Sequence, residues 1–375
     1  MRIAIIGAGM GGLTAAATLR QRGIEVRIYE QAKQFARVGA GIQQSANALR
    51  VLRAIGLEDK IRSLAFQPSS WANREWDSGE MKFDLRLGAE FEEKYGAPYL
   101  LMHRGDLHSA LASAVPPELI EMNRRLVGLA ERTSGVELKF EDGSVEEADG
   151  VIGADGVHST VRELLLGPDE ARFTGRVAYR TTFPAALLKG ASIYDCTKWW
   201  GPDRHIVIYF VTPQKSEIYF VTSQPEPDWR NESWSALGNM DELRAAFKGF
   251  HSQVQRVLEA CPQAHKWALY ERDPLPTWQK GRVVLLGDAC HPMMPYMAQG
   301  ATNAMEDAAV LARCLDGATS ADVPRRFEQY EATRKPRTSR IQLTSRRNEW
   351  LSKRTDPDWV YGYDAWSEPL AAVNK

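Results

Sequence analysis

A run of glycines near the N-terminus restricts the fold more than any other feature of this sequence. Apolar residues 2–6 (RIAII) precede Gly7, Gly9 and Gly12, which have the spacing G-x-G-x-x-G, and helix-forming residues 13–22 follow. Glycine allows a strand to turn sharply into a helix and lets the backbone approach a diphosphate, which the helix N-terminus then faces. The pattern predicts a βαβ unit that binds a dinucleotide.

An acidic residue supports this interpretation. Residues 25–29 (EVRIY) predict a second strand, and Glu30 follows it directly. A carboxylate in that place binds the hydroxyls of a ribose. Met10 and Gln31 lie beside these residues, and we expect them at the same site. Because the pattern fits NAD as well as FAD, a nicotinamide dehydrogenase remains an alternative.

Composition excludes several classes of partner. The net charge of −1 gives no bias toward nucleic acid or an anionic membrane. No run approaches the roughly 20 apolar residues of a membrane-spanning helix. The four cysteines are scattered and lack the spacing of metal ligands, so we expect reduced thiols, a cytoplasmic location and no metal.

The order of strand and helix patterns predicts an α/β fold. Alternating, aromatic-rich runs at 206–212 and 217–222 indicate antiparallel strands, whereas 282–286 (RVVLL) returns to the pattern of a buried parallel strand. We therefore expect a Rossmann-like dinucleotide-binding domain, an inserted, mostly antiparallel sheet domain for substrate, and C-terminal helices. The expected boundaries are 1–70, 100–175 and 270–322 for the first, 71–99 and 176–269 for the second, and 323–375 for the third.

A second constellation follows the strand at 282–286. Gly287-Asp288 ends that strand, and Gln299-Gly300-Ala301 opens a predicted helix that extends to Leu315. A carboxylate at the end of a parallel strand accepts hydrogen bonds from sugar-like hydroxyls. A helix N-terminus beside it would stabilise negative charge on a reduced flavin.

Three separated segments together resemble one family. They are GAGMGG at 7–12, GADGVHS at 153–159 and GDACHPMMPYMAQGA at 287–301, and HRGDL at 103–107 fits the same pattern. Nearly the whole chain is similar to the class A flavoprotein aromatic hydroxylases, which include salicylate, 3-hydroxybenzoate and 4-hydroxybenzoate hydroxylases.

The resemblance implies FAD as cofactor, NADH or NADPH and O₂ as co-substrates, and a flavin C4a-hydroperoxide that attacks a small hydroxylated aromatic or N-heteroaromatic acid. It makes the first predicted domain the FAD-binding domain. It also implies that Gly7, Gly9, Gly12 and Glu30 bind FAD, together with Gln43, Arg104, Leu126, Asp155, Asp288, Gly300 and Ala301. From the residues alone, Arg104 could instead form a surface ion pair and Asp155 could cap a helix.

Within the family, the likeness is greatest to the 6-hydroxynicotinate 3-monooxygenases, which hydroxylate a carboxylate-bearing carbon and release CO₂. KWW at 198–200, DRH at 203–205 and DPDWVYGYD at 356–364 carry this likeness. Where those enzymes have histidine, after GAGI and before Ala-Gln-Gly, this chain has Gln43 and Tyr296. Another hydroxypyridinecarboxylate or a hydroxybenzoate therefore stays open as the substrate.

The substrate pocket is expected between the inserted sheet and the flavin. Tyr209 is the first candidate to hydrogen-bond or deprotonate the ring hydroxyl, and His205 and Gln43 are the other candidate catalytic residues. Tyr209 shares a strand face with Val207. The substrate-binding candidates are Cys196, Tyr209, Tyr219 and Tyr296. For Tyr209 and His205 the alternative is a purely structural role in the core.

Two further alternatives concern the activity and the assembly. A flavin-binding protein without turnover would explain the cofactor motifs but not a polar pocket beside the flavin. The oligomeric state stays open, with a homodimer as one alternative.

Overall fold

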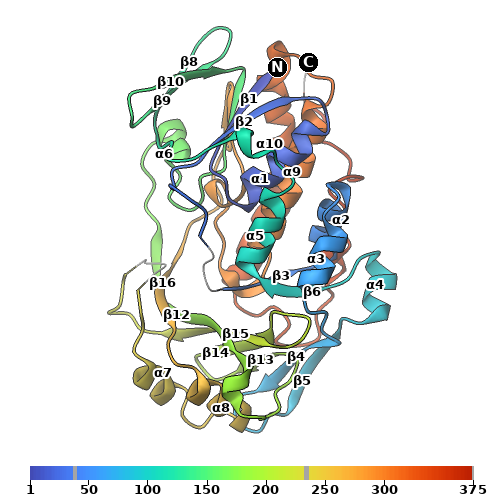
Figure 1. Cartoon of the computed structure of the whole chain (residues 1–375), viewed down its shortest axis with the longest axis vertical. Helices are drawn as coiled ribbons and strands as arrows, with labels where there is room; N and C mark the ends of the chain where they lie inside the picture. Colours follow the sequence, from blue (N-terminus) through green and yellow to red (C-terminus); the bar gives the residue numbers. More distant parts are fainter. Residues whose placement is uncertain (37–39, 232–235, 374–375) are drawn as a thin grey trace.

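The computed structural model describes residues 1–36, 40–231 and 236–373. Two sheets dominate it, one at each end of the molecule, with long helices at the first (Figure 1). Gly39, the first glycine of the GAGI motif, lies outside the described residues.

The first sheet is the predicted Rossmann-like unit. Its six strands have the order β17-β18-β11-β1-β2-β7, and all neighbours are parallel except β17 and β18. The bounds are β1 Arg2–Ile6, β2 Glu25–Tyr29, β7 Ile120–Glu121, β11 Gly150–Gly153, β17 Gln279–Lys280 and β18 Val283–Leu285. The strands expected at 2–6 and 25–29 are confirmed with the same limits, because buried apolar runs bounded by glycine leave little freedom.

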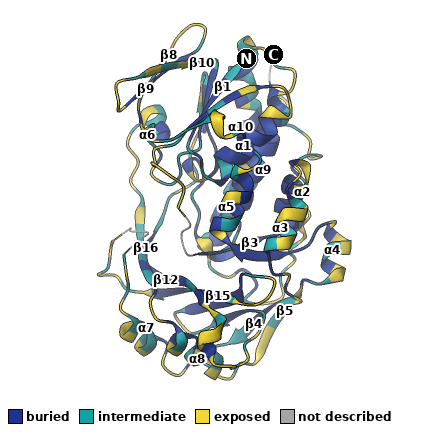
Figure 2. Ribbon diagram, in the orientation of Figure 1, coloured by how far each residue is buried: buried dark blue, intermediate teal, exposed yellow. Residues whose placement is uncertain are grey.

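The helices around this sheet include the most deeply buried part of the chain. Figure 2 shows α1 (Met10–Arg20) and α9 (Gly300–Leu315) almost wholly buried. The first helix begins three residues earlier than predicted, because Gly11 and Gly12 lie inside its first turn. The remaining helices are α2 Ala46–Ala54, α3 Glu58–Leu64, α4 Ala89–Tyr95, α5 Arg104–Ala112, α6 Thr160–Leu166, α7 Met240–Ala246, α8 Ser252–Ala260, α10 Val323–Arg346 and α11 Asp358–Tyr361.

The second sheet forms the opposite end of the molecule. Its seven strands have the order β16-β12-β15-β14-β13-β4-β5, and only β13 and β4 pair in parallel. The bounds are β4 Ser70–Glu75, β5 Met81–Arg86, β12 Arg172–Pro184, β13 Cys196–Trp200, β14 His205–Phe210, β15 Glu217–Pro225 and β16 His265–Glu271. Alternating, aromatic-rich sequence therefore formed the antiparallel sheet that was expected.

Two smaller sheets complete the fold. A turn at Asp142-Gly143 joins β9 (Val136–Phe140) to β10 (Val145–Ala148), which pair in antiparallel, and β8 (Leu126–Glu131) lies beside β9. A two-stranded sheet of β3 (Gly41–Gln44) and β6 (Leu100–His103) lies between the two large sheets, where it carries Gln43. In the described part of the chain, no helix combines the length and apolar character needed to cross a bilayer.

A buried ionic network fixes the loop after β18. Arg334 of α10 contacts Glu306 and Asp307 of α9 at 2.7 Å each, and all three side chains are fully buried. Asp307 also bonds the His291 ring at 2.5 Å and accepts from the Gly287 backbone N–H at 3.2 Å. The network therefore ties the GDACH loop to both helices.

Candidate active site

Two hollows meet at the ends of the parallel strands. The first has a volume of about 410 Å³ and the second about 330 Å³, and both are lined by Gly9, Ala154 and Gly156. Their sizes are in the range of ligand sites. They form one elongated cleft along the edge of the Rossmann-like sheet.

Nearly all the residues predicted to bind cofactor line this cleft. The first hollow contains Gly7, Gly9, Glu30, Gln31, Leu126 and Asp155. The second contains Gly9, Met10, Gln43, Arg104, Asp288, Gly300 and Ala301. Gly12 lines neither hollow, because it packs α1 against the preceding turn, and a Cβ there would lie 2.0 Å from the Gly7 carbonyl oxygen.

The glycine turn leaves open space for a ligand. Gly7 has φ of +102°, and a Cβ on it would meet the Ala154 carbonyl oxygen at 2.5 Å, so only glycine fits there. A Cβ on Gly9 would meet no atom within 4 Å, since that position faces the cleft at the N-terminus of α1. Backbone N–H groups at a helix start in such a place suit a diphosphate.

Glu30 is held rigidly at the far end of the first hollow. One carboxylate oxygen accepts from the Ala8 N–H and the other from the Ala32 N–H, each at 2.8 Å. Arg124 lies beside it with its guanidinium 4.3 Å from the centre of the Phe140 ring. Sequence reasoning missed Arg124, because no motif contains it.

Asp155 supports the cap at the start of α6, where Ser159 is the N-cap residue. It accepts from the Ser159 hydroxyl at 2.5 Å and from the Val161 N–H at 3.0 Å, at the start of α6. Burial raises the pKa of Asp155, and these hydrogen bonds oppose the rise. Because Asp155 also lines the first hollow, its supporting role at the cap leaves it in reach of a ligand.

Arg104 and Asp288 bring opposite charges to the second hollow. Both side chains are exposed to the open cleft. The surrounding protein lowers the pKa of Arg104 by desolvation, and the Asp288 carboxylate opposes that shift. Desolvation likewise raises the pKa of Asp288, against the effects of His291 and Arg104. The two charges therefore act on each other within the cleft. Gly300 begins α9 close by, since a Cβ on it would lie 3.8 Å from the Asp288 Oδ1 atom.

The seven-stranded sheet closes the second hollow. Tyr209 of β14 and Tyr219 of β15 are paired directly across the two strands, with ring centroids 5.0 Å apart. Both side chains line the second hollow. A Cβ on Gly41 would lie 2.7 Å from the Tyr209 hydroxyl, so the phenol reaches β3. Sequence reasoning missed several other lining residues, which are Arg180, Val221, Trp267, Met293, Met294 and Pro295.

Cys196, His205 and Tyr296 lie next to this wall but are not among the residues that line the hollow. Cys196 pairs with Tyr209 across β13 and β14. The ring of His205 lies 5.4 Å from that of Tyr296, and the Tyr296 hydroxyl is 2.9 Å from the Ser223 hydroxyl. Burial and the neighbouring Lys198 lower the pKa of His205, so its imidazole is neutral at pH 7.

Cys290, His291 and Asp307 come close enough to hold a metal ion, but their ligand atoms have other partners. The Cys290 thiol donates to the Gly287 carbonyl oxygen at 3.3 Å, and Asp307 bonds both His291 and Arg334. The Arg334 charge, 2.7 Å from Asp307, repels a second cation. We assign this cluster to the network that fixes the loop.

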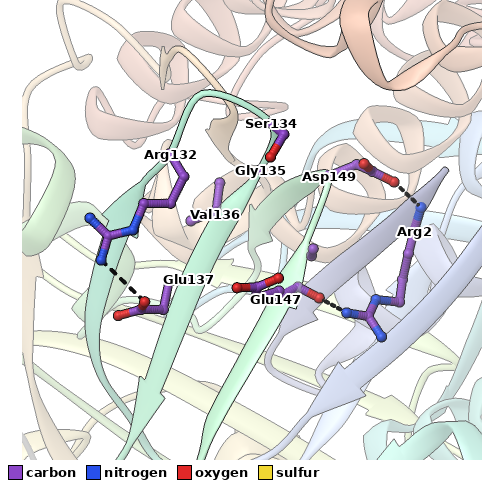
Figure 3. Close-up of a pocket in the computed structure, with 9 residues that line it drawn as sticks. Arg2, Arg132, Ser134, Gly135, Val136, Glu137, Glu147 and Asp149 are labelled. Atoms are coloured by element: carbon purple, nitrogen blue, oxygen red, sulfur yellow. Dashed lines mark hydrogen bonds and ion pairs between the residues drawn. The ribbon is translucent and has the colours of Figure 1, made fainter.

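A further hollow lies away from the cleft, where the β9–β10 hairpin meets the N-terminus (Figure 3). Its polar groups bond one another: Arg132 bonds Glu137 at 3.1 Å, and the Arg2 backbone N–H donates to Asp149 at 2.6 Å. It contains none of the cleft residues, so it does not belong to the site.

The cleft fits FAD on the geometry of this chain. Its two adjoining hollows suit the two halves of a dinucleotide, because Glu30 lines one and the N-terminus of α9 lines the other. FMN lacks the adenosine half that the Glu30 end would hold. The open positions at Gly9 and Gly156, where a Cβ meets nothing within 4 Å, give the backbone room to approach a diphosphate.

Comparisons with known proteins agree with this geometry. The FAD binding domain family matches residues 1–344. The chain is 48% identical over 371 residues to the 6-hydroxynicotinate 3-monooxygenase of Bordetella bronchiseptica, covering 98% of this chain and 97% of the relative. It is 45% identical over 372 residues to the enzyme of that name from Pseudomonas fluorescens, covering 98% and 96%.

Solved structures are similar over the same length. A salicylate hydroxylase substrate complex has a TM-score of 0.84 and 27% identity, covering 97% of this chain and 96% of the other. Klebsiella pneumoniae HpxO complexed with FAD and uric acid has a TM-score of 0.83 and 27% identity, covering 96% and 90%. The chain therefore belongs to the FAD binding domain family and is an FAD-dependent aromatic-ring monooxygenase, as the three sequence segments predicted.

Proposed function

We propose that this monooxygenase hydroxylates a hydroxypyridinecarboxylate of the 6-hydroxynicotinate type and releases the carboxylate as CO₂. The observation that carries the proposal is the second hollow, which brings the Tyr209 phenol and the Gln43 amide to the same cavity as the N-terminus of α9. The two relatives above 40% identity, both named for 6-hydroxynicotinate, support this choice of ring.

The chain's own residues would hold the cofactor along the cleft. Glu30 would bind the adenosine ribose, Gly7 and Gly9 the diphosphate, and Asp288 with Arg104 the ribityl region. Gly300 and Ala301 would face the pyrimidine edge of the flavin, where the start of α9 favours negative charge. Bound FAD, once reduced by NADH or NADPH, supplies electrophilic oxygen derived from O₂.

Tyr209 acts as a hydrogen-bond donor in this proposal. Its side chain is 2% exposed, and burial raises its pKa well above the ordinary value, so the phenol keeps its proton at pH 7. A proton-bearing phenol stabilises negative charge on the ring oxygen of the substrate and so makes the ring more electron-rich. Removing the proton from the ring hydroxyl of the substrate would need another group.

His205 and Lys198 lie behind the wall of the hollow, where they would support it rather than bind the carboxylate of the substrate. His205 lies four residues from Tyr209 on the same face of β14, about 13 Å along the strand. Lys198 is fully buried on the adjacent strand, and its amine lies 3.3 Å from the Asn348 side-chain oxygen. Both groups are beside Tyr296, which like them is not among the residues that line the hollow.

A hydroxybenzoate is the second candidate substrate. Gln43 and Tyr296 stand where the resemblance to 6-hydroxynicotinate 3-monooxygenases implies histidine, and neither can exchange a proton near neutral pH as histidine does. Relatives named for benzoates support it, including a 3-amino-4-hydroxybenzoate 2-monooxygenase of Streptomyces platensis, 39% identical over 386 residues. The ring present in the product distinguishes the two candidates, because a hydroxybenzoate attacked at its carboxylate-bearing carbon would also release CO₂.

Three broader features also remain proposals. We place the domain boundaries at the limits predicted from the sequence, since the second sheet takes its strands from 70–86 and 172–271. We propose a homodimer, which light scattering would test. Four free, buried cysteines suit a reducing compartment, and we propose the cytoplasm.

A substrate screen tests the proposed function. The FAD-loaded protein would be given NADH or NADPH with a panel of hydroxypyridinecarboxylates and hydroxybenzoates, and both donor consumption and product mass would be measured. We expect 6-hydroxynicotinate to give a product that has gained a hydroxyl group and lost CO₂. Donor consumption that matches only H₂O₂ with every acid in the panel would contradict the proposal.

A further inference from the structure

The Gln43 amide lies between two buried phenols. Tyr99, directly before β6, donates its hydroxyl hydrogen to the Gln43 Oε1 atom. Gln43 also hydrogen-bonds the Tyr209 hydroxyl, which reaches β3 beside Gly41. Exposure is 0% for Tyr99, 2% for Tyr209 and 7% for Gln43, so water does not compete for these bonds. The three side chains form a hydrogen-bonded series that ends at the cavity wall.

The chemistry of the Gln43 amide sets the direction of donation along this hydrogen-bonded series. A glutamine side chain has an oxygen that only accepts and a nitrogen that only donates. The hydrogen bond from Gln43 acts to lower the pKa of Tyr209, as a donated N–H does, while Tyr99 is bound at the amide oxygen. The Gln43 nitrogen is therefore the atom turned toward Tyr209, and its N–H donates to the phenol oxygen. The hydrogen of the Tyr209 hydroxyl is then left to point into the cavity.

Neither phenol can reverse that direction by ionising. Burial raises the pKa of both Tyr99 and Tyr209 well above the ordinary value. The amide between them does not ionise at all. At neutral pH each member therefore donates to the next, from Tyr99 to Gln43 and from Gln43 to Tyr209.

We propose that Tyr99, acting through Gln43, fixes the Tyr209 hydroxyl as a hydrogen-bond donor to the cavity, so that the pocket selects the form of the substrate whose ring oxygen carries negative charge. Tyr99 is thus a positioning residue that never touches the substrate. The inference rests on the proposed function, since it requires Tyr209 to face the ring oxygen. It also accounts for Gln43, because an amide held in this orientation supplies the donor that keeps Tyr209 pointing outward.

The ionisation of a bound, fluorinated substrate analogue tests the inference without turnover. Oxidised, FAD-loaded protein would be titrated over pH with 5-fluoro-6-hydroxynicotinate or 3-fluoro-4-hydroxybenzoate, whichever binds more tightly. The ¹⁹F shift reports whether the neighbouring ring oxygen is ionised. We expect the ring hydroxyl of the bound probe to have a lower pKa than in free solution.

Four variants separate the possible outcomes. Tyr209→Phe should raise the pKa of the bound probe by about 1–2 units, because one hydrogen bond to an anion is lost. Tyr99→Phe should raise it by ~0.5 units or more, since Gln43 is free to turn and accept from Tyr209. Gln43→Glu should also raise it, because a carboxylate accepts from both phenols. Tyr330→Phe is the matched control: it is a buried tyrosine that bonds the Leu285 carbonyl oxygen and should leave the probe unchanged.

The results distinguish a failure of the inference about Tyr99 and Gln43 from a failure of the proposed function on which it rests. If Tyr209→Phe raises the pKa of the probe while Tyr99→Phe and Gln43→Glu leave it at the wild-type value, the inference is overturned. If Tyr209→Phe has no effect, or neither probe binds, the proposed function fails and the inference fails with it. Flavin absorbance checks folding, and Gln43→Glu decides the question if Tyr99→Phe loses FAD.

Discussion

Replacing Arg334 with methionine should destabilise the protein more than any exposed substitution. Arg334 is fully buried between Glu306 and Asp307, with contacts of 2.7 Å to each, and it also donates to the Asn303 side-chain oxygen at 3.1 Å. Methionine fills much of the volume but leaves the buried carboxylates without this partner. Glu306 keeps Arg337 at 2.9 Å, whereas Asp307 keeps only His291 and a backbone N–H.

The size of the effect follows from this loss. Removing one partner of a buried ion pair costs about 3–5 kcal/mol, because an uncompensated charge stays in the interior. Part of the cost is relieved because Arg337 still compensates Glu306, so we expect the lower half of that range. At about 2 °C per kcal/mol for a chain of this size, the Tm should fall by roughly 6–8 °C.

The destabilisation should depend on pH in a defined direction. Burial acts to raise the pKa of Asp307, but His291 and Arg334 together hold it below the ordinary value; Glu306 is likewise held low by Arg337 and Arg334. A depressed pKa in the folded state contributes stability above the unfolded pKa, near 4, and loses it as pH falls. The difference between wild type and Arg334→Met should therefore be largest at pH 7 and shrink toward pH 4.

Thermal unfolding of the FAD-loaded proteins, followed by circular dichroism at several pH values, measures both effects. Arg325→Met on the same helix is the matched control, since Arg325 is 40% exposed and contacts Asp322 only at 3.7 Å. It should stay within about 0.5 kcal/mol of wild type. The reasoning fails if Arg334→Met unfolds at the temperature of this control, or if its deficit grows as pH falls.

Three further predictions concern the site. Asp288→Ala should reduce FAD occupancy, read from flavin absorbance, while far-ultraviolet circular dichroism stays unchanged, because it removes an acceptor rather than core volume; undiminished occupancy would remove Asp288 from the cofactor site. Tyr209→Phe should keep FAD but slow hydroxylation by ~10²–10⁴-fold and divert electrons to H₂O₂, since a positioned donor to the ring oxygen is lost; wild-type rates and coupling would leave His205 as the next candidate. Gln43→His combined with Tyr296→His should raise kcat/KM for 6-hydroxynicotinate relative to hydroxybenzoates, and an unchanged ratio would mean that these positions do not set ring preference.

The cofactor half of the site could be predicted from the sequence because its residues lie in contiguous motifs. Gly7, Glu30 and Asp288 each end or follow a strand of one parallel sheet, and such strand ends meet at the same edge. The start of α9 was also predictable, since Gly300 follows a loop of glycine and proline. Arg124 could not be predicted because it belongs to no motif, although it lines the same hollow as Glu30.

The substrate half depends on long-range pairing that no local pattern contains. Strand alternation predicted that Tyr209 lies on one face of β14, but its contact with Gln43 arises because β3 lies between the two large sheets (Figure 1). Tyr99 and Arg180 were missed for the same reason: each lies far in the chain from its neighbours in the site. For Cys196, His205 and Tyr296, the structure gives positions beside the wall, and their roles stay predictions.

The most direct test of the whole account is the mass of the product formed in ¹⁸O₂. The FAD-loaded protein would be supplied with 6-hydroxynicotinate and NADH or NADPH under ¹⁸O₂. The account predicts a pyridine product that contains one ¹⁸O atom and lacks the carboxylate, formed in equal amount to the donor consumed. A product without ¹⁸O, or donor consumption that yields only H₂O₂, would contradict it.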